Sequence, residues 1–424
     1  MAKFRLAPDG PPPPKKSSRP SVLALNSYAG SLLLAAKALK LDIVGSYEDV
    51  GFGLEWQRTN FPHLEGRFAS HRDQWPTRPR LDETVVVAHP PCAAFSTQNS
   101  KGKTRGADSA HFACTLDVMR YAFEGKAPAL LVESVPGALE GGAEYRNALA
   151  AQFKYRVFHV LQNAATFGLP QWRPRYWAVF LRSDQAKRLT LAHAPQFAPA
   201  GPFFDAVPPG DPDPNLVEWI AYQRKLLKLR KVSDEEIDML MCSPGRLPHK
   251  IRKHLGLELL DACRRYCVDA TCPAHKTDRS PGWMKGSPFV SHTVYELDPA
   301  GPSPSILWDS WWTRNGVSVT PAQYRAAGGF PTDYKLDMKY RMWLSKGVAP
   351  PVAAWLLDQV LRTLEGKAND GPEVRHADAG EVLDFTLTKK QWYAAAVTAP
   401  AKKALPAWKL PLRSRRAKQA RLPE

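Results

Sequence analysis

The chain has 424 residues, of which 44% are hydrophobic, and a formal net charge of +17. This length allows two domains with substantial cores. No run of about eighteen apolar residues occurs, which excludes a membrane-spanning helix. Residues 1–20 lack the apolar centre of a signal peptide, so we expect a cytoplasmic protein. The six irregularly spaced cysteines do not indicate a disulfide framework.

Much of the positive charge lies near the two ends of the sequence. Residues 1–20 hold five Lys/Arg and one acidic residue, and residues 401–424 hold eight Lys/Arg and one acidic residue. Neither segment has a core-forming pattern, so we expect disordered tails. Tails of this charge attract nucleic acid without reading its sequence, with solubility as the alternative role.

Apolar strands alternate with helices in the first half of the chain. Near-continuous apolar strands of this kind are buried on both faces of a parallel sheet. The pattern predicts a doubly wound α/β fold whose ligands lie at the carboxyl ends of the strands. We expect strands within 21–30, 42–49, 83–92, 127–137 and 175–182, and helices at 31–41 and 114–125.

The pattern changes after residue 193, where a Pro-rich connector leads to basic helical stretches and then to strands and turns. We predict a second, smaller domain there, after which the chain returns to the first domain. The predicted parts are a disordered tail at 1–20, a main domain at 21–193 plus 335–366, a smaller domain at 194–334, and a largely disordered basic extension at 367–424.

Three strand ends carry reactive or charged side chains. Cys92 follows two prolines after a buried strand, where a cysteine is placed as a nucleophile; a buried structural cysteine is the alternative. Glu133 ends the strand "LLVE", a costly position for a carboxylate unless it is paired or functional. Arg173 and Arg175 enter the next strand and indicate an anion site or a structural ion pair.

Five ordered segments resemble the DNA cytosine-5 methyltransferases. "PPCAAFS" resembles the family's Pro-Cys-Gln-x-Phe-Ser motif, and "ESV" resembles Glu-Asn-Val. "NAATFGLPQWRPR" resembles the motif that ends in Gln-x-Arg-x-Arg. "TPAQYRAAGGFPTDY" and "SKGVAPPVA" resemble the two C-terminal motifs. The resemblance implies a Rossmann-like methyltransferase fold with a target-recognition domain at 194–334.

The resemblance also implies a mechanism. Cys92 would attack C6 of cytosine, which makes C5 nucleophilic, and Arg175 would favour the thiolate. Glu133 would stabilise the charge that develops at N3, and Arg173 completes the implied catalytic set. The target atoms are hidden in double-stranded DNA, so the base must be flipped out of the helix.

The segment 95–106 is polar and contains three cations, which suits a loop that closes over DNA; a plain exposed loop is the alternative. The implied DNA contacts are Ser96, Lys101, Lys103, Arg105 and Gln171.

The implied cofactor is S-adenosylmethionine. Glu48, at the end of the second strand, would accept hydrogen bonds from the ribose hydroxyls. The loop "YAGSLLL" departs from the family's Phe-x-Gly-x-Gly-Gly, with Leu32 and Leu33 in place of the later glycines. The implied cofactor residues are Tyr28, Ala29, Gly30, Glu48, Asp73, Pro91 and Lys346.

Lys346 stands where the family usually has Asn, close to the transferred group. A lysine there repels a sulfonium by about 1 to 4 kcal/mol at a few ångströms, depending on the dielectric. The alternative donor is carboxy-S-adenosylmethionine, whose extra carboxylate would pair with Lys346 and give 5-carboxymethylcytosine. The other alternative is that Lys346 points to solvent or to a phosphate.

Other interpretations remain open. An RNA cytosine-5 methyltransferase usually lacks a large recognition domain, and an inactive DNA-binding relative would not need the catalytic set. We expect a monomer that modifies DNA in a restriction–modification pair or protects a phage genome. A zinc site is a further alternative to helix packing for Cys263, Cys267, Cys272 and His275.

Overall fold

The computed structural model describes residues 20–74, 79–97, 105–208, 293–306, 310–314, 317–336 and 342–398. Most of the predicted recognition segment lies outside these residues, as do the four candidate zinc ligands. Within the described ranges, no group of three or more His, Cys, Asp or Glu side chains could hold a metal ion. In the same ranges, no helix is both long enough and apolar enough to cross a bilayer.

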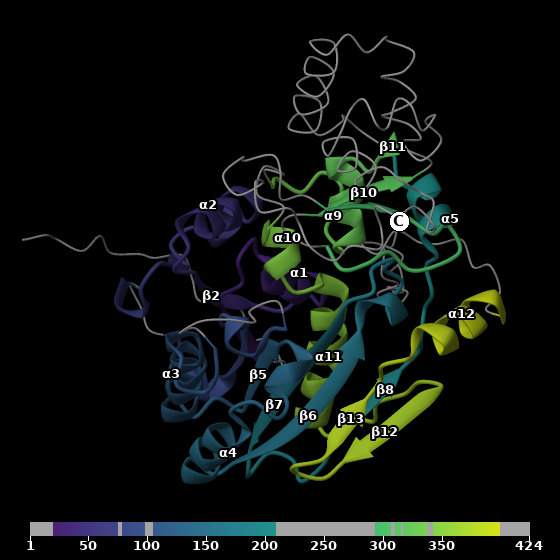
Figure 1. The fold of residues 1–424 in the computed structure, drawn as a ribbon. Coiled ribbons are helices and arrows are strands. Elements are labelled where there is room, and N and C mark those ends of the chain that lie inside the picture. The colour runs from purple at the N-terminus through teal and green to yellow at the C-terminus, as the bar shows by residue number, and fades with distance from the viewer. Residues whose placement is uncertain are drawn as a thin grey trace, which may run out of the picture.

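One large sheet organises the described part of the chain, where eight strands follow the order β13-β6-β7-β5-β4-β1-β2-β3 (Figure 1). The strands are β1 (Ser21–Leu25), β2 (Ile43–Tyr47), β3 (Phe68–Ala69), β4 (Thr84–Ala88), β5 (Ala129–Ser134), β6 (Tyr155–Asn163), β7 (Pro174–Arg182) and β13 (Val382–Asp384). The predicted strands are therefore present, and β3, β6 and β13 are additions to them.

The sheet is parallel except at one strand. β1 pairs in parallel with β2 and β4, and β4 pairs in parallel with β5. β7 is antiparallel to both of its neighbours, β5 and β6. This confirms the predicted doubly wound, mostly parallel fold.

Alternate residues of the central strands pack against different helices, because successive side chains of a strand point to opposite faces. Val22 and Val85 share a core cluster with helices α1 (Ser31–Ala38) and α11 (Pro350–Leu364). Leu23 and Val86 belong to a second cluster with α3 (Ala110–Glu124) and α4 (Ala143–Gln152). Figure 1 shows α3 and α4 apart from α1 and α11. Helices thus cover both faces, as the apolar strands predicted.

Shorter elements complete the described structure. The remaining α-helices are α2 (Gly51–Asn60), α5 (Ala200–Ala206), α9 (Pro321–Ala327), α10 (Met342–Lys346) and α12 (Lys389–Thr398). Single 3₁₀ turns lie at Pro62–Leu64, Arg72–Gln74, Leu81–Glu83, Ala93–Phe95, Pro136–Ala138 and Ala164–Thr166. Two small sheets are formed by β9 (Thr293–Glu296), β10 (Ser310–Arg314) and β11 (Val317–Ser318), and by β8 (Leu189–His193) with β12 (Glu373–Ala377).

The described parts of the predicted second domain share a core with the main sheet. Trp312 of β10 is fully buried and stacks on Tyr324 of α9, with ring centroids 5.1 Å apart. Thr320 begins α9 with a capping box. Tyr334 donates a 2.5 Å hydrogen bond to the carbonyl of Ala29, directly after β1. These segments therefore support the region of the predicted cofactor loop.

The prediction of a largely disordered extension from residue 367 is wrong for residues 367–398. β13 pairs in parallel with β6 at the edge of the main sheet, and β12 pairs with β8. Trp392 of α12 is fully buried, and its Nε1 donates to the carbonyl of Ala165 at 2.8 Å. Within this extension Ala377, Leu383, Phe385 and Trp392 are buried, whereas Val374 and Val382 are exposed.

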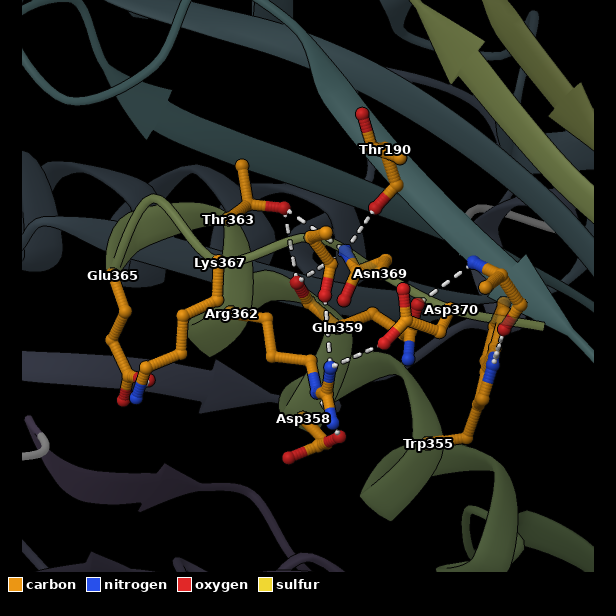
Figure 2. A network of polar contacts seen from close by, with 12 residues as sticks. Thr190, Trp355, Asp358, Gln359, Arg362, Thr363, Glu365, Lys367, Asn369 and Asp370 are labelled. Atoms are coloured by element: carbon orange, nitrogen blue, oxygen red, sulfur yellow. Dashed lines mark hydrogen bonds and ion pairs between the residues drawn. The ribbon is translucent and has the colours of Figure 1, made fainter.

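Polar contacts hold the start of this extension against the end of α11 (Figure 2). The Asn369 amide donates to the carbonyls of Thr190 at 2.5 Å and Gln359 at 3.2 Å. Gln359 in turn accepts a 2.7 Å hydrogen bond from the backbone N–H of Ala192. The main domain therefore continues beyond the predicted boundary at residue 366.

Candidate active site

The predicted nucleophile lies on a tight turn after β4. The backbone N–H of His89 donates to the carbonyl of Leu25 at 3.0 Å, so the chain stays aligned with β1 as it leaves the sheet. Two prolines then lead to Cys92, whose φ of −87° and ψ of 0° lie in the sparsely populated bridge region. Its side chain is half-buried. The turn therefore presents the thiol at the carboxyl edge of the sheet.

Glu133, near the end of β5, is fully buried between two basic groups. Its Oε1 lies 3.1 Å from Nε of Arg175 at the start of β7, and its Oε2 lies 2.9 Å from Nε2 of His89. Arg175 can reach Glu133 because β7 runs antiparallel beside β5. The structure thus joins the ends of three strands into what we call the active-site cluster, namely Cys92, His89, Glu133 and Arg175.

The cluster favours a thiolate. Burial raises the pKa of Cys92, but hydrogen bonding to His89 and the charges of His89 and Arg175 outweigh burial and lower it overall. Burial lowers the pKa of His89, but Glu133 and Cys92 reverse this and raise it to about 9. A thiolate with a lowered pKa is the form that attacks an electrophile near neutral pH.

Arg173 is buried and holds the segment that contains Lys346. Its guanidinium donates to the carbonyls of Ser345 and Gly347, both at 2.6 Å. Its backbone N–H donates to Oδ1 of Asn163 at 2.8 Å. Burial, with the nearby charge of Arg175, lowers the pKa of Arg173 to about 9. Lys346 itself is exposed at the end of α10, on a backbone that Arg173 fixes from both sides.

The predicted cofactor loop is a strained turn between β1 and α1. Tyr28 has a φ of 47° and Gly30 a φ of 89°, both in the left-handed region. A Cβ atom on Gly30 would lie 2.7 Å from Oη of Tyr334 and 3.1 Å from Phe61, so no larger residue fits there without movement. Leu32 and Leu33, which replace the family's glycines, are buried in the core beneath the turn.

Glu48 joins this loop to the end of β2. Its two oxygens accept from the backbone N–H groups of Tyr28 at 2.6 Å and Val50 at 3.1 Å. Burial, together with the neighbouring Asp49, raises the pKa of Glu48 to about 8. Asp73 is exposed in the turn after β3, and half-buried Pro91 lines a small internal space with Phe95 and Tyr176.

Of the residues predicted to contact DNA, the structure describes Ser96, Arg105 and Gln171. Gln171 is buried, and its amide bonds to the backbone of Ala327 at 3.3 Å and Ile306 at 3.1 Å. The polar atoms of Gln171 thus join backbone segments, and a DNA contact by Gln171 stays a prediction. Half-buried Ser96 and exposed Arg105 border the nucleophile turn, whereas Lys101 and Lys103 lie outside the described residues.

Sequence reasoning missed His89. The residue follows the apolar strand "VVVA" directly, so the strand-end argument that selected Cys92 and Glu133 applies to it as well. The contact with Glu133 has no local signal, because it joins positions 44 residues apart, at 89 and 133.

The fold and the site together define a class. The order and direction of the strands are those of a Rossmann-like methyltransferase fold. Two solved structures share this fold at low sequence identity. One is a DNA modification methyltransferase encoded within an Escherichia coli prophage, with a TM-score of 0.51, 17% identity, and coverage of 81% of this chain and 99% of that one. The other is the Entamoeba histolytica methyltransferase EhMeth, with a TM-score of 0.51, 12% identity, and coverage of 82% and 98%.

The family follows from the sequence match. Residues 21–208 match the family model of the C-5 cytosine-specific DNA methylases. A curated relative, type II methyltransferase M.AquIA of a Picosynechococcus strain, is 30% identical over 111 residues, which cover 23% of this chain and 44% of the relative. The chain thus spans less than half the length of that relative. The part that contains Cys92, Glu133 and Arg175 therefore matches the C-5 cytosine-specific DNA methylase family, as the motifs predicted.

Proposed function

We propose that the protein transfers a methyl group to C5 of cytosine in double-stranded DNA. The observation that carries this proposal is the active-site cluster, in which a strand-end thiol with a lowered pKa lies beside a buried carboxyl group held by Arg175. The cluster lies within the family match and borders the loop at Tyr28, whose ring meets the His89 ring edge to face at 5.1 Å.

The residues of the loop fit S-adenosylmethionine. Packing of Gly30 against Tyr334 and Phe61 holds the turn in its left-handed conformation, and Glu48 supplies a carboxyl group at the end of β2. Tyr28, Ala29, Gly30 and Glu48 would hold the donor, and Lys346 would lie near the transferred group. The donor supplies an electrophilic methyl group when bound.

Each residue of the active-site cluster has its own role in the transfer reaction. The Cys92 thiolate bonds to C6 of a flipped cytosine, and the ring electrons move toward C5. Glu133 hydrogen-bonds N3 and stabilises the charge that develops there, while Arg175 keeps the carboxyl group oriented. After transfer, a base removes the C5 proton and the Cys92 sulfur leaves. Arg173 acts on this site through the segment 345–347.

Nucleoside mass spectrometry tests the proposal directly. The purified chain is incubated with double-stranded DNA and S-adenosylmethionine, and 5-methylcytosine is the expected product. Cys92→Ala should reduce transfer by at least about 10³-fold, since it removes the nucleophile. Cys114→Ala, which changes the half-buried cysteine of α3, is the matched control and should retain activity. Modification of transfer RNA in place of DNA would overturn the proposed substrate.

A second candidate activity, carboxymethyl transfer, rests on Lys346. Arg173 donates to the carbonyls on both sides of this residue, which supports a fixed backbone position for Lys346. The same assay with carboxy-S-adenosylmethionine should then yield 5-carboxymethylcytosine, and Lys346→Asn should shift preference toward S-adenosylmethionine. Methylcytosine alone, with the same donor preference in Lys346→Asn, would eliminate this candidate.

The biological setting is also a proposal. The type II name of the curated relative and the prophage origin of one structural neighbour support DNA modification, either beside a restriction nuclease or in a phage genome. Complete digestion of host DNA by a nuclease that cytosine methylation blocks, after expression of the chain, would argue against both settings.

A further inference from the structure

His89 has an environment that a structural histidine does not need. It is 1% exposed and lies directly after β4, three residues before the nucleophile. Its Nε2 lies 2.9 Å from Oε2 of Glu133, the group assigned to N3 of cytosine. One ring nitrogen of His89 is therefore committed to the catalytic carboxyl group.

The other ring nitrogen is left for the nucleophile. Nδ1 of His89 is buried and has no protein hydrogen-bond partner of regular geometry. Hydrogen bonding to His89 is the largest influence that lowers the pKa of Cys92. Because Nε2 is held by Glu133, Nδ1 is the atom available to the thiol. The imidazole ring thus lies between the nucleophile and the acid.

Packing and charge hold the ring in this role. The Tyr28 ring meets the imidazole edge to face at 63°, which limits rotation of the ring. Glu133 has two oxygens with about four lone-pair sites, so contacts with His89 and Arg175 leave lone pairs for a further hydrogen bond. The titratable and charged groups around His89 are Cys92 from its own turn, Glu133 from β5, Arg175 from β7, and Tyr28 from the loop after β1.

We propose that His89 is a catalytic residue that relays the thiol proton of Cys92 through Glu133 to N3 of the target cytosine. Nδ1 takes the thiol proton, Nε2 passes its proton to Oε2 of Glu133, and Glu133 protonates N3. A sulfur electron pair forms the bond to C6, and the C5=C6 pair moves toward N3. This inference rests on the proposed function and identifies the proton source of its first step.

The relay runs in reverse at the end of the reaction. Removal of the C5 proton by a base restores the C5=C6 bond, and the sulfur leaves C6 with the bonding electrons. N3 returns its proton through Glu133 and His89, so the cluster regains its starting protonation. The net change is replacement of one C5 proton by the transferred group, and no oxidant or reductant is required.

Two substitutions separate a relay from structural support. The amide nitrogen of Gln in His89→Gln can occupy the position of Nε2 and keep the contact with Glu133. The amide of Asn in His89→Asn can occupy the position of Nδ1 and keep a contact with Cys92. Neither amide transfers a proton. His159→Gln, a change at a buried histidine whose hydrogen bond is to Tyr176, is the matched control.

The first experiment needs neither DNA nor donor. The full chain is treated with iodoacetamide at pH 5 to 10, and alkylation of the Cys92 peptide is followed by mass spectrometry, with the Cys114 peptide as internal standard. His89→Gln should reduce the Cys92 rate at pH 7 by about tenfold or more, as the pKa returns toward about 8.5. His159→Gln should match the wild type. An unchanged pH profile in His89→Gln would overturn the relay.

The second experiment measures transfer to DNA by the same variants. Both His89 variants should lose about 10²- to 10⁴-fold in kcat, the usual contribution of a positioned acid–base group. Near wild-type kcat in His89→Gln would assign His89 a positioning role and overturn the relay, while the proposed function stands. A wild-type chain that transfers nothing to DNA would count against the proposed function and against the relay to N3, and the alkylation profile would still decide whether His89 takes the thiol proton of Cys92.

Discussion

Two neighbouring residues of β7, Arg175 and Tyr176, belong to buried polar clusters on opposite faces of the sheet. Arg175 joins the active-site cluster on the face of α1 and α11, whereas Tyr176 bonds to Nδ1 of His159 at 2.7 Å on the face of α3 and α4. Each group contains a buried histidine. The pKa of His89 is raised to about 9, but burial and the charge of Arg146 lower the pKa of His159 to about 4.

The difference shows what distinguishes a reactive polar group from a structural one. Burial favours the neutral form of any histidine, and a hydroxyl partner such as Tyr176 leaves that preference in place. A buried carboxylate reverses it, but its desolvation is costly unless the fold supplies several partners. Glu133 has two basic partners, His89 and Arg175. Its desolvation cost is therefore partly offset, at the site where these charges favour the Cys92 thiolate.

Glu133→Gln tests the charged group of the comparison, the active-site cluster, and should have the largest effect on transfer. The neutral amide cannot donate a carboxyl proton to N3, and it removes the charge that raises the pKa of His89. We expect transfer to DNA to fall about 10²- to 10⁴-fold, measured as kcat on a cytosine-containing duplex. The control is His159→Gln on the other face. A kcat for Glu133→Gln within a few-fold of the wild type would remove this carboxyl group from the mechanism.

Two buried arginines, Arg173 and Arg146, extend the comparison to the free energy of unfolding. Arg173 donates to the carbonyls of Ser345 and Gly347, and Arg146 donates to those of Ala138 and Gly141. Arg173→Met and Arg146→Met should each reduce the free energy of unfolding by about 2 to 4 kcal/mol in urea, since buried carbonyls lose charged donors.

Donor binding should then separate these two arginine variants. Arg173 holds the segment of Lys346, so Arg173→Met should weaken S-adenosylmethionine binding in calorimetry, and Arg146→Met should not. Equal affinity in both variants would show that the segment 345–347 does not contact the donor.

The lowered pKa of His159 predicts that the free energy of unfolding depends on pH with the opposite sign from the dependence due to His89. A folded pKa of about 4 against about 6.5 in the unfolded chain means that the unfolded state binds more protons between these values. The free energy of unfolding should therefore fall as the pH drops from about 6.5 to 4, by on the order of 2 kcal/mol from this residue. Urea titrations of wild type and His159→Gln should converge at acidic pH. His89, whose pKa is raised, contributes stability below about 6.5 that is lost as the pH rises through about 9.

Tyr176→Phe should have the smallest effect. The substitution removes the hydroxyl that bonds to His159 and leaves the ring in the core. We expect a loss of about 1 to 2 kcal/mol in the free energy of unfolding, the usual cost of one buried polar group left unpaired. Transfer to DNA should remain within about twofold of the wild type. A large loss of kcat would mean that the two faces of β7 are coupled.

Local patterns in the sequence predicted a large part of the fold. The apolar runs at 21–25, 84–88 and 129–134 predicted buried strands, and strand-end logic selected Cys92 and Glu133. β13 escaped prediction because its three residues become a strand only when β6 pairs with them. The burial of Trp392 was not predicted either, because α12 has little amphipathic pattern of its own. Trp392 is held by tertiary contacts such as its hydrogen bond to Ala165.

The order of strands and helices and the identity of the strand-end side chains could be read from the sequence, because both depend on neighbours within a few positions. Only the tertiary structure decided which of those side chains meet. His89 reaches Glu133 because β4 lies beside β5, and Arg175 reaches it because β7 returns antiparallel. Gln171 and Arg173 bind backbone groups inside the protein, because the segments after residue 293 bring carbonyl and N–H groups within hydrogen-bond distance of them. Burial and sheet register, which join distant positions, set the charges that make Cys92 reactive.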